Sequence, residues 1–473
     1  MKLYNSLTRK VEDFEPRLEG KIGMYTCGPT VYSTPTIGNF RTYTLSDILS
    51  RSLRYLGYDV KHVMNLTDVG HLTGDNLGDA DTGEDRLEKA AKKEGKTAWE
   101  ISTAYSSEFY EHMKLLNIVV PDIVCKATDH IPEQIVMVQG LEQKGFVYRI
   151  SDGMYFDVAS YEAMGNRYGE LSTLDQIKAG ARVEPNKEKK DPRDFALWKF
   201  SPSGERRQME WDSPWGVGFP GWHIECSAMS TKYLGSQFDL HVGGEDLRST
   251  HHPNEIAQAE GATGKRPFVT TWIHGAFLLV DGGRMGKSLG NAYTVEDVVA
   301  KGVDPLALRY LYLTGHYRRQ LNFTWDALAS AQTALTKLRG IYSGARVDQD
   351  RTALSEEKLA KIQEYSRDFR ARLEDDLDMP GVLATLWEVA KSNIPGVDKT
   401  ELFADIDHVL GLDLDHATPV KEMSEKVKKL MVKREKLRKA KKWEAADLVR
   451  DEIEALGWKV SDPSASSGHA KPL

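Results

Sequence analysis

The sequence predicts an α/β protein whose first half is built on a parallel β-sheet. Residues 21–27 (KIGMYTC) are expected to form a short buried strand, and 28–39 are a loop punctuated by glycine and proline. Residues 40–58 carry apolar side chains at helical spacing, and 59–69 (DVKHVMNLTDV) are a second candidate strand. This order indicates a βαβ unit, whose two strands lie parallel in one sheet.

The carboxyl ends of these two strands are the expected place for a ligand. In open parallel sheets, ligands bind just beyond the carboxyl ends of the strands. If both strands are central, Cys27, Thr67 and Asp68 lie near one another there.

The later segments differ in character. Residues from about 120 to 200 combine short strand-like runs with turns, as expected for an insertion into the first fold. Strand-like runs return at 238–244 and 272–280, and from about 305 onward the pattern is nearly all helical. The final residues, 461–473, are rich in serine, glycine and proline and are expected to be disordered.

Composition limits the class of protein. The chain has 473 residues, of which 40% are hydrophobic and 28% charged, as in soluble globular proteins, and no apolar run is long enough to span a membrane. The N-terminus lacks the apolar core of a signal peptide. Three cysteines cannot form a disulfide framework, so we expect a protein of the reducing cytoplasm. The net charge of −7 argues against a surface that binds nucleic acid throughout.

Two adjacent histidines and a glutamate in residues 249–258 (STHHPNEIAQ) raise the question of a metal site. His251 and Glu255 are four residues apart and would share one face of a helix. If Pro253 occupies the first helical position, however, His251 lies outside the helix and the loop must orient it. Without a CxxC pair, a zinc site and a polar helix start beside buried thiols both remain open. Thiolate ligands would have to come from the three cysteines, Cys27, Cys125 and Cys226.

A series of short motifs runs in order along most of the chain. The segments are YTCGPTVY, NLTDVGHL, DFALWK, PGWHIECSAM, DLHVGGEDL, HHPNEIAQ and RMGKSLGN, followed by LRYLYLTGHYRRQLNF and EDDLDMP. Together they resemble the cysteine–tRNA ligases, a class I aminoacyl-tRNA synthetase family. The resemblance implies ATP-dependent activation of L-cysteine to cysteinyl-adenylate and its transfer to the 3′ end of tRNA(Cys).

The resemblance also implies an architecture. The expected parts are a Rossmann-type catalytic core at 1–119 and 200–260, a connective insertion at 120–199, a flexible signature loop and stem-contact region at 261–320, a helical bundle at 321–405, and a C-terminal anticodon-region domain with a disordered tail at 406–473.

By the same resemblance, one zinc ion per subunit would select the substrate. Apolar packing separates cysteine from serine or alanine by only ~1–3 kcal/mol. A zinc ion that bonds the substrate thiolate discriminates better, because sulfur is a softer ligand than a hydroxyl. His252 and Cys125 are then expected to be structural. The implied ligands are Cys27, Cys226, His251 and Glu255.

The resemblance assigns a pocket for the cysteine substrate as well. Asp246 is suited to hold the ammonium group, and Trp222 to wall the site. Taken without the resemblance, a core tryptophan and a turn aspartate would be the ordinary interpretations. The implied substrate-binding residues are Gly28, Thr67, Trp222, His241 and Asp246.

Two loops are implied in ATP activation. The family's Lys-Met-Ser-Lys-Ser reads Arg-Met-Gly-Lys-Ser here, so Arg284, Lys287 and Ser288 are the expected ATP contacts, with Mg²⁺ accompanying ATP. Lys287 is the expected catalytic contact to the triphosphate.

The family's His-Ile-Gly-His reads Thr-Ile-Gly-Asn here. Gly38 is retained, as a close backbone approach to a nucleotide requires. Thr36 and Asn39 replace both histidines; they can donate hydrogen bonds but carry no positive charge. We expect these three residues to make catalytic contacts to the phosphates.

A basic stretch at 421–442 holds eleven lysines and arginines against three glutamates. Alone it is typical of a solvated amphipathic helix; with the resemblance it becomes the expected surface for tRNA phosphates. We expect a monomer that contacts no membrane. Two rival functions remain, a mycothiol-type cysteine ligase, which lacks such a C-terminal extension, and a catalytically silent paralogue.

Overall fold

The chain folds as two compact units, which are described separately. The computed structural model describes residues 1–72, 83–172, 186–202, 204, 207–286, 289–347, 354–416, 425–439, 442–455, 458–460 and 470–472. The first unit comprises residues 1–415 and the second 416–473. The division falls ten residues after the boundary expected at 405/406, because helix α14 (Gly396–Leu410) runs through that position.

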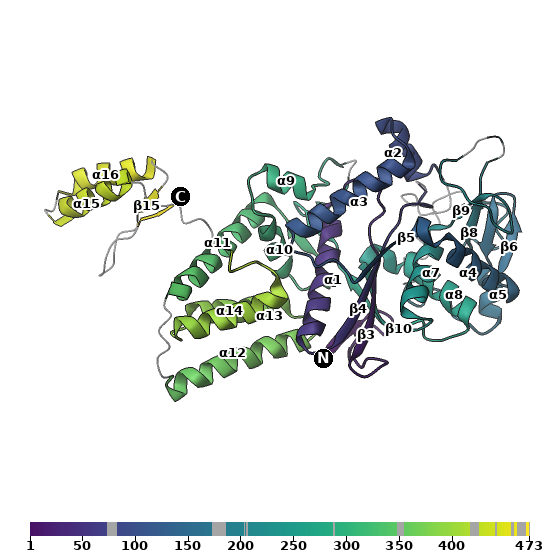
Figure 1. Cartoon of the computed structure of the whole chain (residues 1–473), viewed down its shortest axis with the longest axis horizontal. Helices are drawn as coiled ribbons and strands as arrows, with labels where there is room; N and C mark the ends of the chain where they lie inside the picture. The colour runs from purple at the N-terminus through teal and green to yellow at the C-terminus, as the bar shows by residue number, and fades with distance from the viewer. Residues whose placement is uncertain are drawn as a thin grey trace. The chain divides into compact units, whose positions relative to one another are not determined.

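A five-stranded parallel sheet forms the centre of the first unit (Figure 1). Its strand order is β11-β10-β3-β4-β5, and every neighbouring pair is parallel. The predicted βαβ unit is confirmed as β3, α1 (Ile37–Tyr55) and β4. The strands span Lys21–Thr26 (β3), Asp59–Leu66 (β4), Ile123–Lys126 (β5), Phe238–Gly244 (β10) and Val269–Gly275 (β11).

Alternate residues of these strands face two different hydrophobic clusters. Met24 and Leu240 join the cluster that contains the apolar side of α1. Tyr25 on β3 and Trp272 on β11 join a second cluster. This cluster also contains Cys226 on α7 (Trp222–Leu234) and part of α8 (His251–Thr263). Because both faces are covered, the strands are apolar on both sides, as parallel sheets require.

A second sheet lies at one side of the core and consists of four antiparallel strands (Figure 1). It corresponds to the predicted insertion, but it extends to β9 (Gly218–Pro220), which pairs with β8 (Phe195–Phe200). Strand β5 begins after residue 120 yet belongs to the core sheet. The other elements here are α4 (Ile131–Gln143), β6 (Val147–Ile150), β7 (Gly153–Phe156) and α5 (Val158–Ala163).

The predicted strand at 272–280 is divided into β11 and β12 (Leu278–Val280). At the break, the buried Arg41 guanidinium donates to the carbonyl oxygens of Ala276 and Phe277 at 2.6 and 2.7 Å. The Phe277 carbonyl oxygen also accepts from the backbone nitrogen of Leu321, so the chain changes its strand partners here. Strand β12 pairs instead with β13 (Gly283–Arg284) and β14 (Leu321–Phe323).

The predicted helical region follows. None of the described helices is both long and apolar enough to cross a membrane. Its helices are α9 (Val295–Ala300), α10 (Pro305–Leu313), α11 (Trp325–Val347), α12 (Glu356–Glu374), α13 (Met379–Lys391) and α14. Two further helices of the first unit, α2 (Arg86–Glu94) and α3 (Ala98–Leu115), lie earlier in the chain, between β4 and β5. A hairpin of β1 (Lys2–Asn5) and β2 (Lys10–Asp13) opens the chain.

The second unit contains a helical pair, α15 (Glu425–Lys439) and α16 (Trp443–Ala455). The pair buries a small apolar cluster that includes Val427 and Ile453. Short strands β15 (Trp458–Val460) and β16 (Ala470–Pro472) pair antiparallel. The tail was expected to be disordered throughout; the pairing of β16 differs from this, and residues 461–469 lie outside the described residues.

One buried ion pair links the core to the helical bundle. The Arg309 side chain on α10 is fully buried and donates to an Asp47 carboxylate oxygen on α1 at 2.5 Å. Its remaining donors reach the carbonyl oxygens of Leu410, Leu116 and Asn117 at 2.6–3.1 Å. The guanidinium thus joins α1, α10, the end of α3 and the end of α14.

Replacing Arg309 with methionine keeps the side-chain length but removes the charge and every donor. We expect the free energy of unfolding, measured in urea, to fall by about 3–5 kcal/mol, because breaking a buried pair leaves polar groups uncompensated. The exposed pair Arg370–Glu374 on α12 provides the control. Arg370→Met should cost less than about 1 kcal/mol, and equal losses in the two variants would contradict this interpretation.

Candidate metal centre and substrate cavity

Four potential metal ligands from distant parts of the sequence meet at the carboxyl edge of the core sheet. Cys27 follows β3 directly, Cys226 lies on α7, and His251 and Glu255 lie on α8. Their ligand atoms all lie within 4.8 Å of one another, and all four residues are buried. The predicted ligands are therefore together.

Close packing of the first two strands places Cys27. A Cβ atom at Gly28 would lie only 1.7 Å from the backbone oxygen of Asn65, so no other residue fits there without moving β4. The Asn65 side chain accepts a hydrogen bond from the Gly28 nitrogen at 2.9 Å. Backbone bonds join Thr67 to Pro29 and Val31 in the same way.

The start of α8 differs from the sequence-based reasoning. The helix begins at His251, with Thr250 as its N-cap, and Pro253 lies within the first turn. A proline is tolerated there because the first backbone N–H groups of a helix have no intrahelical partner. His251 and Glu255 therefore share one helix face, and the distance from His251 Nε2 to Glu255 Oε1 is 3.0 Å.

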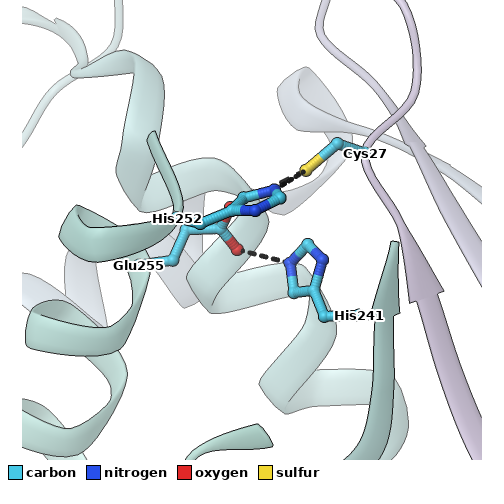
Figure 2. Close-up of side chains that lie close together, drawn as sticks. All are labelled: Cys27, His241, His252 and Glu255. Carbon is cyan, nitrogen blue, oxygen red and sulfur yellow. Dashed lines mark hydrogen bonds and ion pairs between the residues drawn. The ribbon is translucent and has the colours of Figure 1, made fainter. Parts of the chain in front are cut away.

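A second donor set shares two members with the first. Cys27 and Glu255 also lie within 4.8 Å of His241 and His252, and Figure 2 shows these four side chains converging. His252 Nε2 lies 3.4 Å from the Cys27 sulfur, and His241 Nε2 lies 2.9 Å from Glu255 Oε2. The geometry alone thus offers two ways to hold a cation.

The first donor set suits zinc better. Zinc bonds of about 2.0–2.3 Å place tetrahedral ligand atoms roughly 3.3–3.8 Å apart. The sulfurs of Cys27 and Cys226 are 4.0 Å apart, and the Cys27 sulfur is 3.7 Å from Glu255 Oε1. This set contains two thiols, the ligands that zinc favours. In the second set, His241 already holds the other oxygen of Glu255, as a residue that orients a ligand would do.

The protonation states support a concentrated charge at the cluster. Burial raises the pKa of the Cys226 thiol, but hydrogen bonds from Cys27 and His251 outweigh it and lower the pKa to about 6. Burial disfavours the charged form of Glu255, yet His241 and His251 lower its pKa to about 2. Burial, reinforced by Cys226 and Glu255, raises the pKa of the Cys27 thiol well above its usual value. The anionic forms of Cys226 and Glu255 are thus favoured before a cation binds.

Further histidines surround the cluster, and two of them, His223 and His274, were not singled out from the sequence. His223 Nδ1 lies 2.8 Å from His251 Nδ1, and His252 Nδ1 lies 2.7 Å from His274 Nε2. Burial lowers the pKa of His223, His252 and His274 well below the usual value, so these rings are neutral. Neutral rings accept and donate at once, which lets them orient ligands.

A cavity of about 280 Å³ opens beside the cluster. Three of the predicted substrate residues, Gly28, Trp222 and Asp246, line it together with Cys27. Thr67 and His241 are both buried and do not line this cavity. Other lining residues carry no earlier prediction, namely Tyr32, His71 and Arg86.

His71 holds Trp222 against the cavity wall. The two rings stack at a centroid distance of 4.3 Å and an interplanar angle of 8°. His71 Nδ1 lies 2.9 Å from the Thr30 hydroxyl, which fixes the ring. The sequence signal was present, since His71 belongs to the quoted motif NLTDVGHL, but nothing in its spacing pointed to Trp222.

Thr36 and Asn39 line the same cavity. They form a capping box at the start of α1, in which Thr36 Oγ1 accepts from the Asn39 backbone nitrogen at 3.4 Å. Asn39 Oδ1 accepts from the Thr36 nitrogen and hydroxyl at 2.9 and 2.8 Å. The side-chain nitrogen of Asn39, Nδ2, has no partner among the described residues, so it remains able to donate a hydrogen bond to a ligand.

The expected signature loop is joined to these residues as well. Thr294 bridges to Thr36, and Asn291 accepts a hydrogen bond from the Gly286 nitrogen at 2.9 Å. Arg284 is exposed at the end of β13. The two other predicted ATP contacts, Lys287 and Ser288, lie outside the described residues.

Comparison with known proteins yields a consistent result. Residues 13–333 match the family model described as the catalytic domain of class I (C) tRNA synthetases. Cysteine–tRNA ligase 1 of Burkholderia lata is 46% identical over 468 residues, covering 97% of this chain and 94% of that protein. Cysteine–tRNA ligases of Treponema denticola and Thermus thermophilus are 41% and 39% identical, covering 99% and 97% of this chain and the same shares of their own.

Solved structures support the fold class. Methionyl-tRNA synthetase of Mycobacterium tuberculosis in complex with methionyl-adenylate aligns with a TM-score of 0.55 at 14% identity, covering 83% of this chain and 90% of that one. A putative arginyl-tRNA synthetase of Campylobacter jejuni aligns with a TM-score of 0.51, covering 85% and 93%. At this identity the likeness concerns the fold, and it agrees with the predicted Rossmann-type core.

The two donor sets can be separated by metal analysis. We expect about one zinc per purified chain, and Cys226→Ser and His251→Gln should weaken zinc binding by more than the about 10–100-fold typical of residues that only orient ligands. Cys125→Ser is the matched control, because Cys125 is a buried free thiol outside the cluster. Loss of zinc in His252→Gln but not in Cys226→Ser would instead favour the second set.

Proposed function

Because the chain belongs to the cysteine–tRNA ligase family of class I aminoacyl-tRNA synthetases, we propose that its cavity activates cysteine as an adenylate and that a zinc ion selects the thiol. The enzyme is a ligase that attaches cysteine to tRNA(Cys). The meeting of Cys27, Cys226, His251 and Glu255 beside the cavity carries the proposal. Bound there, zinc would supply a soft Lewis acid for the substrate sulfur.

The residues around the cluster would fix the amino acid. Trp222 stacks on His71 and contacts His251 at a centroid distance of 4.6 Å, so it forms a rigid wall next to the metal ligands. Asp246 lines the cavity and would pair with the substrate ammonium. Serine presents a hydroxyl, a harder ligand than a thiolate, and would bind more weakly in this pocket. His241 would not contact the substrate; it would hold the Glu255 carboxylate in place.

The part of the cavity at Thr36 and Asn39 would bind ATP with its Mg²⁺. The carboxylate of cysteine attacks the α-phosphorus, the bond to the bridging oxygen breaks, and pyrophosphate leaves with the electron pair. Such a step needs mainly positioning and stabilisation of charge. The N-terminus of the long helix α1 is a ready anion site, and the amide of Asn39, with Gly38 beside it, would donate to the phosphates. Arg284, Lys287 and Ser288 would complete the contacts.

The tRNA-binding role would extend into the second unit. Helix α15 carries much of the basic stretch, and its described part supports a surface for phosphates. The curated relatives span nearly the whole chain, including this extension, which disfavours a small-molecule cysteine ligase. All three cysteines are free in the structure, which supports the expected reducing cytoplasm. We retain the expectation of a monomer.

An aminoacylation assay tests the proposed function directly. Purified protein, ATP, Mg²⁺, unmodified tRNA(Cys) transcript and labelled cysteine should yield cysteinyl-tRNA, and serine should give no detectable product. Pyrophosphate exchange without tRNA separates activation from transfer. Activity with an aminated sugar but not with tRNA would favour the mycothiol-type ligase, and no exchange at all would favour the silent paralogue.

Three substitutions in the capping box should have unequal effects. Asn39→Ala removes the donor that remains for phosphate, and we expect pyrophosphate exchange to slow by about 10²–10³-fold, the cost of losing one donor to a developing charge. Thr36→Ser should change the rate little, because a serine hydroxyl can form the same cap. Thr36→Ala should cost about 1 kcal/mol of stability. Wild-type rates in both alanine variants would reject the role of this loop.

A further inference from the structure

A second group of potential metal ligands lies on two helices that take no part in the cysteine cluster. Glu108 and His112 are four residues apart on α3, and Glu296 lies on α9. Each offers a ligand atom, and these atoms lie within 4.8 Å of one another. His112 Nε2 bonds directly to Glu296 Oε1. Residues four apart share a helix face, which explains how α3 presents both of its donors to α9.

The polar atoms of this group are incompletely satisfied. The His112 side chain is 2% exposed and packs edge-on against Phe40, and its Nδ1 has no hydrogen-bond partner in the described part of the chain. One oxygen of Glu108 is also buried without a partner. Across the described residues, no lysine or arginine pairs with either glutamate. Two carboxylates therefore converge on one imidazole.

We propose that Glu108, His112 and Glu296 bind one divalent cation. Two carboxylates with room for water suit Mn²⁺, and the imidazole adds one nitrogen ligand. A cavity of about 390 Å³ is lined by the same three residues together with Glu111 and Leu115. It leaves room for water molecules to complete the coordination of the ion.

The position of the site gives the cation a structural task. Helix α9 starts immediately after the signature loop, and Thr294 caps it through a capping box with Asp297. Thr294 also bridges to Thr36, which lines the substrate cavity. A cation shared by α3 and Glu296 would therefore fasten the segment that leaves the loop to the body of the first unit.

Titration of the zinc-loaded full chain with Mn²⁺ in the absence of nucleotide tests the proposal. Zinc keeps the thiolate cluster filled, because Mn²⁺ competes poorly for soft ligands. Electron paramagnetic resonance should show the free Mn²⁺ signal decreasing until one equivalent is bound. Glu296→Gln and Glu108→Gln should weaken this binding at least tenfold, and Glu296 is half exposed, so its variant should fold normally.

Glu111→Gln provides the matched control. Glu111 is exposed on the same helix and lines the same cavity, but it does not belong to the ligand group, so its variant should bind Mn²⁺ as the unmodified protein does. Mn²⁺ should also raise the melting temperature of the unmodified protein but not that of Glu296→Gln. The absence of a saturable equivalent, or equal binding by Glu296→Gln and the unmodified protein, would overturn the proposal.

Discussion

The buried carboxylate of Glu255 is the interaction around which the centre of this enzyme is arranged. The residue is fully buried, and its two oxygens face different partners: Oε1 lies 3.0 Å from His251, and Oε2 lies 2.9 Å from His241. An isolated carboxylate in such a place would be very costly. Partners from β10, α8 and the end of β3 must therefore come together with it, and this requirement fixes how the helices meet the sheet.

This arrangement places two kinds of chemistry around one cavity. Soft donors gather where β3 ends and α7 and α8 begin, while the start of α1 supplies hydroxyl and amide groups without charge. Trp222 stacks on His71 and contacts His251, one of the four clustered donors. A substrate that carries a thiol at one end and a carboxylate at the other fits this polarity, which is why the geometry and the family agree.

Local patterns predicted the parallel core, because strand, loop and helix signals at 21–69 lie within one βαβ unit. The ligand set could be predicted only through the resemblance, since Cys27 and Cys226 are 199 residues apart and no spacing rule connects them. At the break in the strand-like run 272–280, Ala276 bonds to Arg41, which is 235 residues away in the sequence. The group on α3 and α9 likewise joins positions 184 apart, His112 and Glu296, and left no signal in the sequence.

The capping box at the start of α1 has a consequence for how the enzyme responds to acid. Imidazoles in those two positions would gain charge as the pH falls through about 6.5. The hydroxyl of Thr36 and the amide of Asn39 do not ionise in that range. In the proposed role, the start of α1 would therefore present the same charge to a nucleotide in mildly acidic and in neutral solution.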